Sequence, residues 1–149
     1  MDEKIVRNQV EIKSTKAQVW ELLTNPEKTK LYMFGCEALS DWKPGSELLW
    51  RGSYEGKEMV FVKGFILDII PGSLLIYSVI DPNATYPHTP ENHLRVTYQL
   101  KETDGMVFLT VSQDGFETAA EGEKRYKDVY NNGDGWNPIL VEIKILAEA

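Results

Sequence analysis

His88, Glu91 and His93 are the residues best suited to acid–base or metal chemistry. A carboxylate between two imidazoles could transfer protons or contribute ligands to a metal ion. A zinc site needs at least three ligands at suitable spacing, however, and this segment does not supply them. His93 also has the same strand parity as Arg95 and Thr97, on the face expected to meet solvent. We therefore predict two surface histidines, no bound metal ion and no cofactor.

Cys36 is the only cysteine, so an internal disulfide is impossible and a reducing compartment is the simplest interpretation. A nucleophilic cysteine needs a nearby base or cation to lower its pKa, and no local motif provides one. The sequence also lacks a phosphate-binding loop, a nucleotide-binding fingerprint and a G-x-S-x-G motif. We predict a buried, unreactive thiol in a protein that is not an enzyme.

A second group of residues could bind a small molecule rather than transform one. These large, mostly aromatic candidates are Trp50, Tyr54, Phe61, Tyr77, Tyr98, Gln113, Trp136 and Leu140. An apolar cavity with a few convergent polar groups is the usual form of a small-molecule site. The same rings could instead interdigitate as an ordinary close-packed core. The amide of Gln113 favours the cavity, because a buried amide needs partners and a ligand hydroxyl or carbonyl could be one.

An amphipathic segment at the end of the sequence would help to position these residues. Within residues 134–149, Trp136, Leu140 and Ile143 recur at helical spacing, and Pro138 suits the first turn. Burial of this face contributes about 10 kcal/mol as an upper bound. An apolar face of this size has to cover a broad surface, so we predict a helix packed across a curved antiparallel sheet.

Strand-like segments separated by turn signals occupy most of the chain. They span residues 4–13, 36–42, 47–54, 58–70, 74–80, 93–102 and 106–113. Short helices are predicted over 14–25 and 26–34, and another within 117–133. Residues 81–92 contain three prolines and no hydrophobic periodicity, which indicates a long loop that could gate access to the cavity. Strand parity places Trp50 and Tyr54 on one face.

The order of these elements is that of the helix-grip fold of birch-pollen-allergen-like and START-like proteins. Within that group, the chain resembles the family homologous to the activator of the heat-shock-protein-90 ATPase. The segments that carry the resemblance are AQVWELLTNPE, SDWKPGS with Trp50 just downstream, GFILDIIPGSLLIYS, VSQDGF and DGWNPILVEIKILAE. Many members carry tryptophan after the second helix, where this chain has Leu31, Tyr32 and Met33. The floor of the pocket is therefore expected to differ.

The resemblance implies an α+β helix-grip domain over residues 1–149. Its curved antiparallel sheet would have six or seven strands, with two short helices and a long C-terminal helix packed across it. A cavity between sheet and helix would hold a hydrophobic molecule that is lipid, sterol-like or aromatic. The alternative function is that of a chaperone-associated stress-response protein, as the family name implies.

Composition limits the partners that we expect. The formal net charge is −7 and no long basic run is present, which argues against nucleic acid or an anionic membrane surface. No apolar run is long enough to span a membrane, and the N-terminus has no apolar signal core, so we expect a cytoplasmic protein. The protein would be a monomer or a homodimer, with Phe65 or Leu49 as candidate contact residues.

Overall fold

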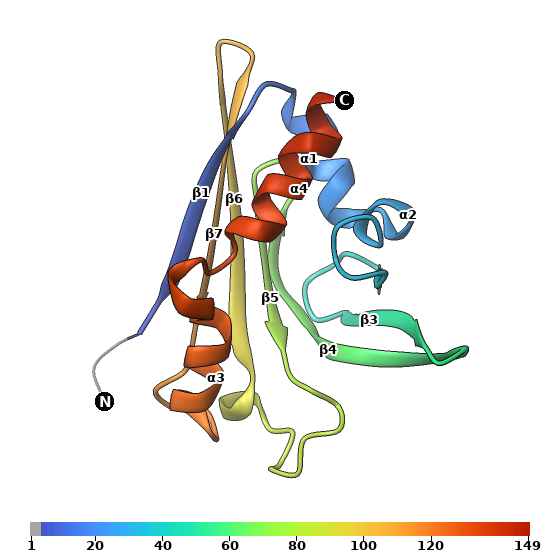
Figure 1. Cartoon of the computed structure of the whole chain (residues 1–149), viewed down its shortest axis with the longest axis vertical. Helices are drawn as coiled ribbons and strands as arrows, with labels where there is room; N and C mark the ends of the chain where they lie inside the picture. Colours follow the sequence, from blue (N-terminus) through green and yellow to red (C-terminus); the bar gives the residue numbers. More distant parts are fainter. Residues whose placement is uncertain (1–3) are drawn as a thin grey trace.

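Seven antiparallel strands form one curved sheet in the computed structural model of the chain, which describes residues 4–149 (Figure 1). The strands are β1 (Val6–Ile12), β2 (Glu37–Ser40), β3 (Glu47–Tyr54), β4 (Lys57–Ile70), β5 (Leu74–Val79), β6 (Leu94–Thr103) and β7 (Met106–Asp114). Their order across the sheet is β1-β7-β6-β5-β4-β3-β2. The helices are α1 (Lys16–Thr24), α2 (Pro26–Thr29), α3 (Gly122–Tyr130) and α4 (Asn137–Glu148), with 3₁₀ turns η1 (Pro90–Asn92) and η2 (Asn131–Gly133). The predicted α+β helix-grip fold is confirmed, with seven strands.

The sheet bends where the long strand β4 changes partner. Its first part pairs with β3 and its last part pairs with β5. At the change, the backbone N–H of Phe65 donates to the Ser78 hydroxyl over 2.9 Å instead of to a carbonyl of β5. A Cβ atom at Gly64 would lie 1.7 Å from the Ser78 carbonyl oxygen, so only glycine allows this close approach. The β3–β4 hairpin consequently turns away from the long strands (Figure 1).

Alternation along the central strands gives the sheet an apolar inner face. The buried positions on β6 and β7 are Leu94, Val96, Tyr98, Leu100, Val107, Leu109, Val111 and Gln113. The intervening side chains of both strands are exposed or half-buried. The predicted period of two is thus confirmed, with one buried face and one that meets solvent.

Each of the first two helices begins directly after a residue whose side chain caps its N-terminus. The Thr15 hydroxyl accepts from the backbone N–H of Gln18 and starts α1, and the Asn25 side chain accepts from that of Glu27 and starts α2. The second helix is shorter than the predicted 26–34: it ends at Thr29, and the chain continues as a series of turns up to Gly35. The buried Thr29 hydroxyl accepts from the backbone N–H of Ala38 over 2.9 Å, which holds the following loop against β2.

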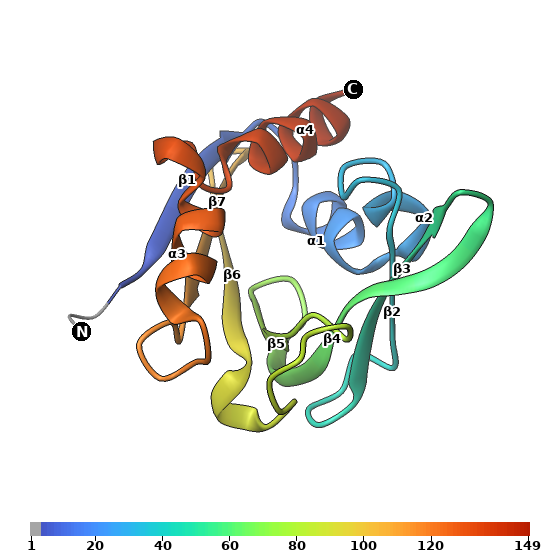
Figure 2. The same ribbon diagram turned by 60° about the horizontal axis from the view of Figure 1, so that its bottom comes forward.

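The C-terminal helix α4 lies beside β1 and on the same side of the sheet as α1 (Figure 2). It begins after Trp136, and its Leu140 and Ile143 side chains are completely buried in the main core. Lys144 donates to the backbone carbonyl of Glu11 over 2.7 Å. The predicted terminal helix is therefore present, but it packs over the β1 side of the sheet.

Candidate functional site

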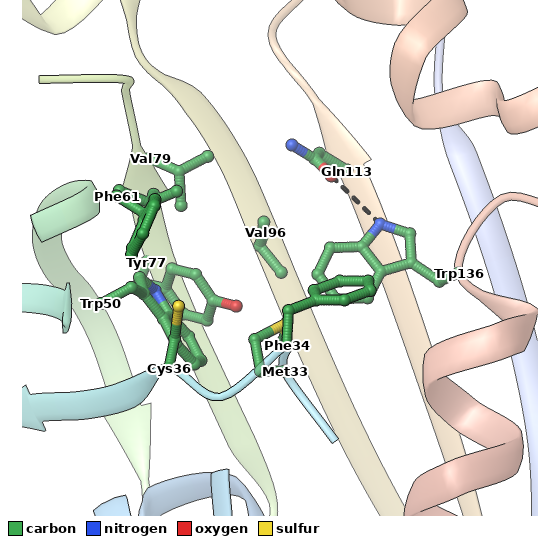
Figure 3. Close-up of a pocket in the computed structure, with 11 residues that line it drawn as sticks. Met33, Phe34, Cys36, Trp50, Phe61, Tyr77, Val79, Val96, Gln113 and Trp136 are labelled. Carbon is green, nitrogen blue, oxygen red and sulfur yellow. Dashed lines mark hydrogen bonds between the residues drawn. The ribbon is translucent and has the colours of Figure 1, made fainter. Parts of the chain in front are cut away.

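A pocket of about 380 Å³ lies against the inner face of the sheet, between the loop after α2 and the start of α4 (Figure 3). Its lining residues are Met33, Phe34, Cys36, Trp50, Phe61, Val62, Tyr77, Val79, Val96, Gln113 and Trp136. They come from β3, β4, β5, β6, β7, the loop before β2 and the residue before α4. None of these described lining residues carries a formal charge. The walls are therefore almost wholly apolar.

Five predicted site residues are brought together here: Trp50, Phe61, Tyr77, Gln113 and Trp136. The rings of Trp50 and Tyr77 are tilted by 49°, with their centroids 6.1 Å apart. Gly52 belongs to the same end of the pocket, since a Cβ atom there would lie 3.1 Å from the Cys36 sulfur and from the Phe61 ring.

Tyr54 does not line the pocket, contrary to the sequence-based expectation. Its side chain is 60% exposed, and it pairs with Lys57 at the tip of the β3–β4 hairpin. Parity put Tyr54 on the same face as Trp50, but residues 53–58 at the hairpin tip are all exposed. A bulge beside Trp50 and Arg51 also changes the register before the tip is reached.

Tyr98 and Leu140 are buried behind the pocket rather than in its walls. The Tyr98 ring lies edge-on to Trp136, with centroids 5.9 Å apart, and 6.2 Å from Tyr77. Leu140 belongs to the closed core beneath the body of α4. The pocket meets α4 only at Trp136, the residue before the helix, and does not extend beneath the body of the helix, where a ligand was expected.

Hydrogen bonds fix the polar corner of the pocket. The Trp136 indole N–H donates to Gln113 Oε1 over 3.0 Å (Figure 3). The backbone N–H of Trp136 donates to Asn8 Oδ1 over 2.9 Å, which ties the indole to β1. A Cβ atom at Gly135 would lie 2.4 Å from that same oxygen, so the chain approaches Asn8 closely only because residue 135 is glycine. The indole and the amide thus hold one another in place.

Met33 and Phe34, at the rim of the pocket, were not among the candidate site residues, although the family resemblance placed Met33 near the pocket floor. Phe34 has a positive φ of 54° and its side chain is 88% exposed, although part of the ring lines the pocket. The helical pattern over residues 26–34 concealed them, because it extended the helix past Thr29. The available signal was Gly35, which marks a left-handed turn and not only a helix end.

Residues 81–92 do not line the pocket, and gating of the pocket by this loop stays a prediction. The loop instead contacts the segment that leads into α3. The Asn92 side chain accepts from the backbone N–H of Ala120 over 2.9 Å, and Arg125 donates to the Asn92 carbonyl over 2.7 Å.

The family described as Activator of Hsp90 ATPase homolog 1-like protein matches residues 13–148. The chain belongs to this family. The resemblance predicted from the sequence is therefore confirmed. None of the curated proteins shows significant similarity to the chain.

Several solved structures are similar to this member of the Hsp90 ATPase activator homologue family. A Cytophaga hutchinsonii protein is 36% identical, with a TM-score of 0.68, over 97% of this chain and 99% of its own. The Aha1 dimer from Colwellia psychrerythraea is 13% identical, with a TM-score of 0.69, over 97% and 96%. An HSP90 activator from Plasmodium falciparum is 12% identical, with a TM-score of 0.66, over 95% and 94%. The last two are similar in fold alone.

The two titratable side chains in the pocket of this family member, Tyr77 and Cys36, are uncharged near pH 7. Burial, reinforced by the neighbouring phenols of Tyr98 and Tyr32, raises the pKa of Tyr77 well above its ordinary value. Burial also raises the pKa of the Cys36 thiol. The site therefore presents protonated hydroxyl and thiol groups rather than a nucleophile or a base.

The histidines lie outside the pocket. His88 is exposed and His93 is half-buried, and each has a ring nitrogen within hydrogen-bond distance of a carbonyl of its own loop. Among residues 4–149, no three potential ligands are grouped closely enough to hold a metal ion. In the same part of the chain, no helix has both the length and the apolar character needed to cross a bilayer.

Proposed function

We propose that the protein binds a small hydrophobic molecule, lipid, sterol-like or aromatic, in the pocket beside Trp136. The observation that carries this proposal is a volume of about 380 Å³ surrounded by 11 side chains, almost all apolar. Small-molecule sites typically have volumes of roughly 300 to 1,000 Å³ and walls of this kind.

Binding without chemical conversion is the role that best fits these walls. General acid–base catalysis needs a group whose pKa lies near the working pH. The pocket offers the phenol of Tyr77 and the thiol of Cys36, and burial raises the pKa of both groups away from neutrality. We therefore propose a carrier or sensor rather than an enzyme.

The test is to fill the pocket and measure binding. Val96 lines the pocket from β6, whereas the next residue, Thr97, is half-buried on the opposite face of the strand. Val96→Phe should occupy the space, and Thr97→Phe is the matched control. Both variants and the wild type are titrated with a library of fatty acids and neutral aromatic compounds, while melting temperature and tryptophan fluorescence are followed.

A binding compound at a hundred times its Kd should raise the melting temperature of the wild type by about 5 to 10 °C. The same shift is expected for Thr97→Phe and should be absent for Val96→Phe. Failure of every compound to shift the wild type, or equal shifts in Val96→Phe, would contradict the proposal.

Chaperone association is the second candidate function. Family membership and the structural likeness to an HSP90 activator favour it. The structure adds exposed apolar side chains on β4, at Phe65, Leu67 and Ile70, as a candidate contact surface. If this function operates, the wild type and Val96→Phe should stimulate the ATPase of purified heat-shock protein 90 equally, and Leu67→Ser should be weaker. No stimulation by the wild type would count against this role.

A further inference from the structure

We infer that the pocket selects neutral ligands carrying a hydrogen-bond acceptor, such as a ketone, ester or quinone oxygen, and that Gln113 is the residue that selects them. This inference rests on the proposed binding function and deepens it. It specifies both the polar group and the charge of the ligand.

The orientation of the Gln113 amide follows from its partner. An indole nitrogen can only donate, so the atom that contacts Trp136 Nε1 at 3.0 Å must be the amide oxygen. The amide nitrogen then lies on the side away from the indole (Figure 3). Gln113 is only 6% exposed and lines the pocket, and no group within residues 4–149 accepts from its nitrogen. Two N–H groups are thus available to an acceptor in the pocket.

The amide cannot reverse without losing this contact. A flipped side chain would bring its NH₂ group against the indole N–H, and two donors cannot pair. The indole itself is held by the bond from its backbone N–H to Asn8 and by the edge-on Tyr98 ring. Gln113 therefore presents a preorganised donor, which lowers the entropy cost of binding an acceptor.

The other polar groups on the walls also favour a neutral ligand. They are the indole of Trp50, the phenol of Tyr77 and the thiol of Cys36, and none of them is a cation. A carboxylate in this pocket would be buried without an opposite charge, at a cost of several kcal/mol. A neutral carbonyl can accept from Gln113 without that cost, so ketones and esters should be preferred to the corresponding acids.

Three matched probes separate these possibilities: acetylnaphthalene, ethylnaphthalene and naphthoate, all substituted at the same ring position. They share one ring system and differ in carrying a neutral acceptor, no acceptor or a charged acceptor. Their Kd values for the wild type at neutral pH can be measured from the quenching of tryptophan fluorescence. We expect the ketone to bind roughly 3- to 10-fold more tightly than the ethyl compound and at least about 10-fold more tightly than the acid.

Variants at Gln113 assign the preference to its amide. Gln113→Leu removes the donor and should reduce the ketone-to-ethyl ratio of affinities to about one. Gln113→Met also removes the donor but keeps similar bulk and a weakly accepting sulfur beside the Trp136 indole, so it separates ligand recognition from the position of the indole. The ketone preference should be lost in this variant as well. Val79→Ala is the control, because it removes apolar wall and should weaken both neutral probes together without changing their ratio.

The outcomes distinguish this inference from the proposed function. Equal binding of the ketone and ethyl probes by the wild type would overturn the inference and leave ligand binding intact. A ketone preference that survives in both Gln113 variants would also overturn the inference and leave ligand binding intact. Tight binding of naphthoate would have the same consequence. If no probe binds the correctly folded wild type, both the inference and the proposed function fail.

Discussion

Tyr32, Tyr77 and Tyr98 are all buried, yet their hydroxyls have different surroundings. The Tyr32 hydroxyl donates to the carbonyl of Leu22 in α1 over 2.6 Å. The Tyr98 hydroxyl is buried and makes no hydrogen bond of normal geometry within residues 4–149, although the Tyr77 phenol lies close enough to lower the pKa of Tyr98 against the larger effect of burial. An unmade hydrogen bond in a protein interior costs more than a made one contributes, so these phenols should respond oppositely to the same substitution.

Tyr98→Phe should raise the free energy of unfolding by about 1 kcal/mol at neutral pH, because it removes a desolvated hydroxyl that gains nothing in return. Tyr32→Phe, the matched control, should lower it by about 1 kcal/mol, because it leaves the Leu22 carbonyl without its donor. Urea denaturation of the two variants measures both changes. A destabilised Tyr98→Phe variant would show that the hydroxyl has a partner, such as a bound water.

At the scale of elements, the bend in β4 determines where the pocket can form. It turns the β3–β4 hairpin so that Trp50 and Phe61 line the same pocket as residues of β5, β6 and β7 (Figure 3). The bend depends on Gly64 and on the hydroxyl of Ser78, which takes the place of a backbone acceptor.

Gly64→Ala should lower the free energy of unfolding by about 3 kcal/mol or more, because its methyl group would overlap the Ser78 carbonyl and force the strands apart. Gly105→Ala is the control. It also replaces a glycine, at a φ of +78°, but no atom lies within 4 Å of the added Cβ. Strain alone should cost this variant about 1 kcal/mol. Equal costs in urea denaturation would show that the close approach at Gly64 is unimportant.

The rim loop between α2 and β2 combines backbone strain with an exposed ring. Phe34→Gly should change the free energy of unfolding by less than about 1 kcal/mol, because relief of the positive φ offsets the added freedom of the unfolded chain. If the proposed binding function operates, Phe34→Gly should weaken binding of a neutral aromatic probe by roughly 3- to 10-fold, because the variant lacks the apolar ring at the rim. Leu31→Ala, an exposed neighbour outside the pocket, should change neither quantity. Unaltered affinity in Phe34→Gly would exclude this role.

Periodicity in the sequence predicts where the helices and strands lie better than it predicts which parts of them neighbouring elements cover. The alternation that ends at Gln113 correctly places that residue on the inner face of β7. The same parity rule fails at Tyr54, since it identifies a face but not how far neighbouring elements extend over it. Leu140 shows the corresponding limit for helices. The apolar stripe of a helix does not reveal which of its side chains pack into the core and which line a pocket. Phe34 was missed because the helical pattern over residues 26–34 conceals the left-handed turn in which Phe34 and Gly35 both have positive φ angles.

Across the whole molecule, the buried phenols make stability depend on alkaline pH. Burial is the largest cause of the raised pKa of Tyr32, Tyr77 and Tyr98. A group with a raised folded-state pKa binds its proton more tightly in the native state. Its stabilising contribution is therefore complete below the unfolded pKa, near 10, and is lost as the pH rises towards the folded value.

The free energy of unfolding should therefore fall above about pH 10, by about 1.4 kcal/mol per pH unit for each of the three tyrosines. In the Tyr98→Phe variant, the free energy of unfolding should fall less steeply with pH, by about 1.4 kcal/mol per pH unit less than in the wild type. Urea denaturation between about pH 9 and pH 11 measures both slopes. A slope for the wild type no steeper than that expected from exposed tyrosines alone would contradict this prediction.

The pairing of β1 with β7 has a consequence for biosynthesis. Trp136 hydrogen-bonds to Asn8 across a separation of 128 residues, and β1 finds its strand partner only when β7 has been made. At roughly 5 to 20 residues per second, a ribosome would leave that first strand unpaired for several seconds or longer. Val6 and Ile12, which are buried in the finished sheet, would remain exposed during that interval.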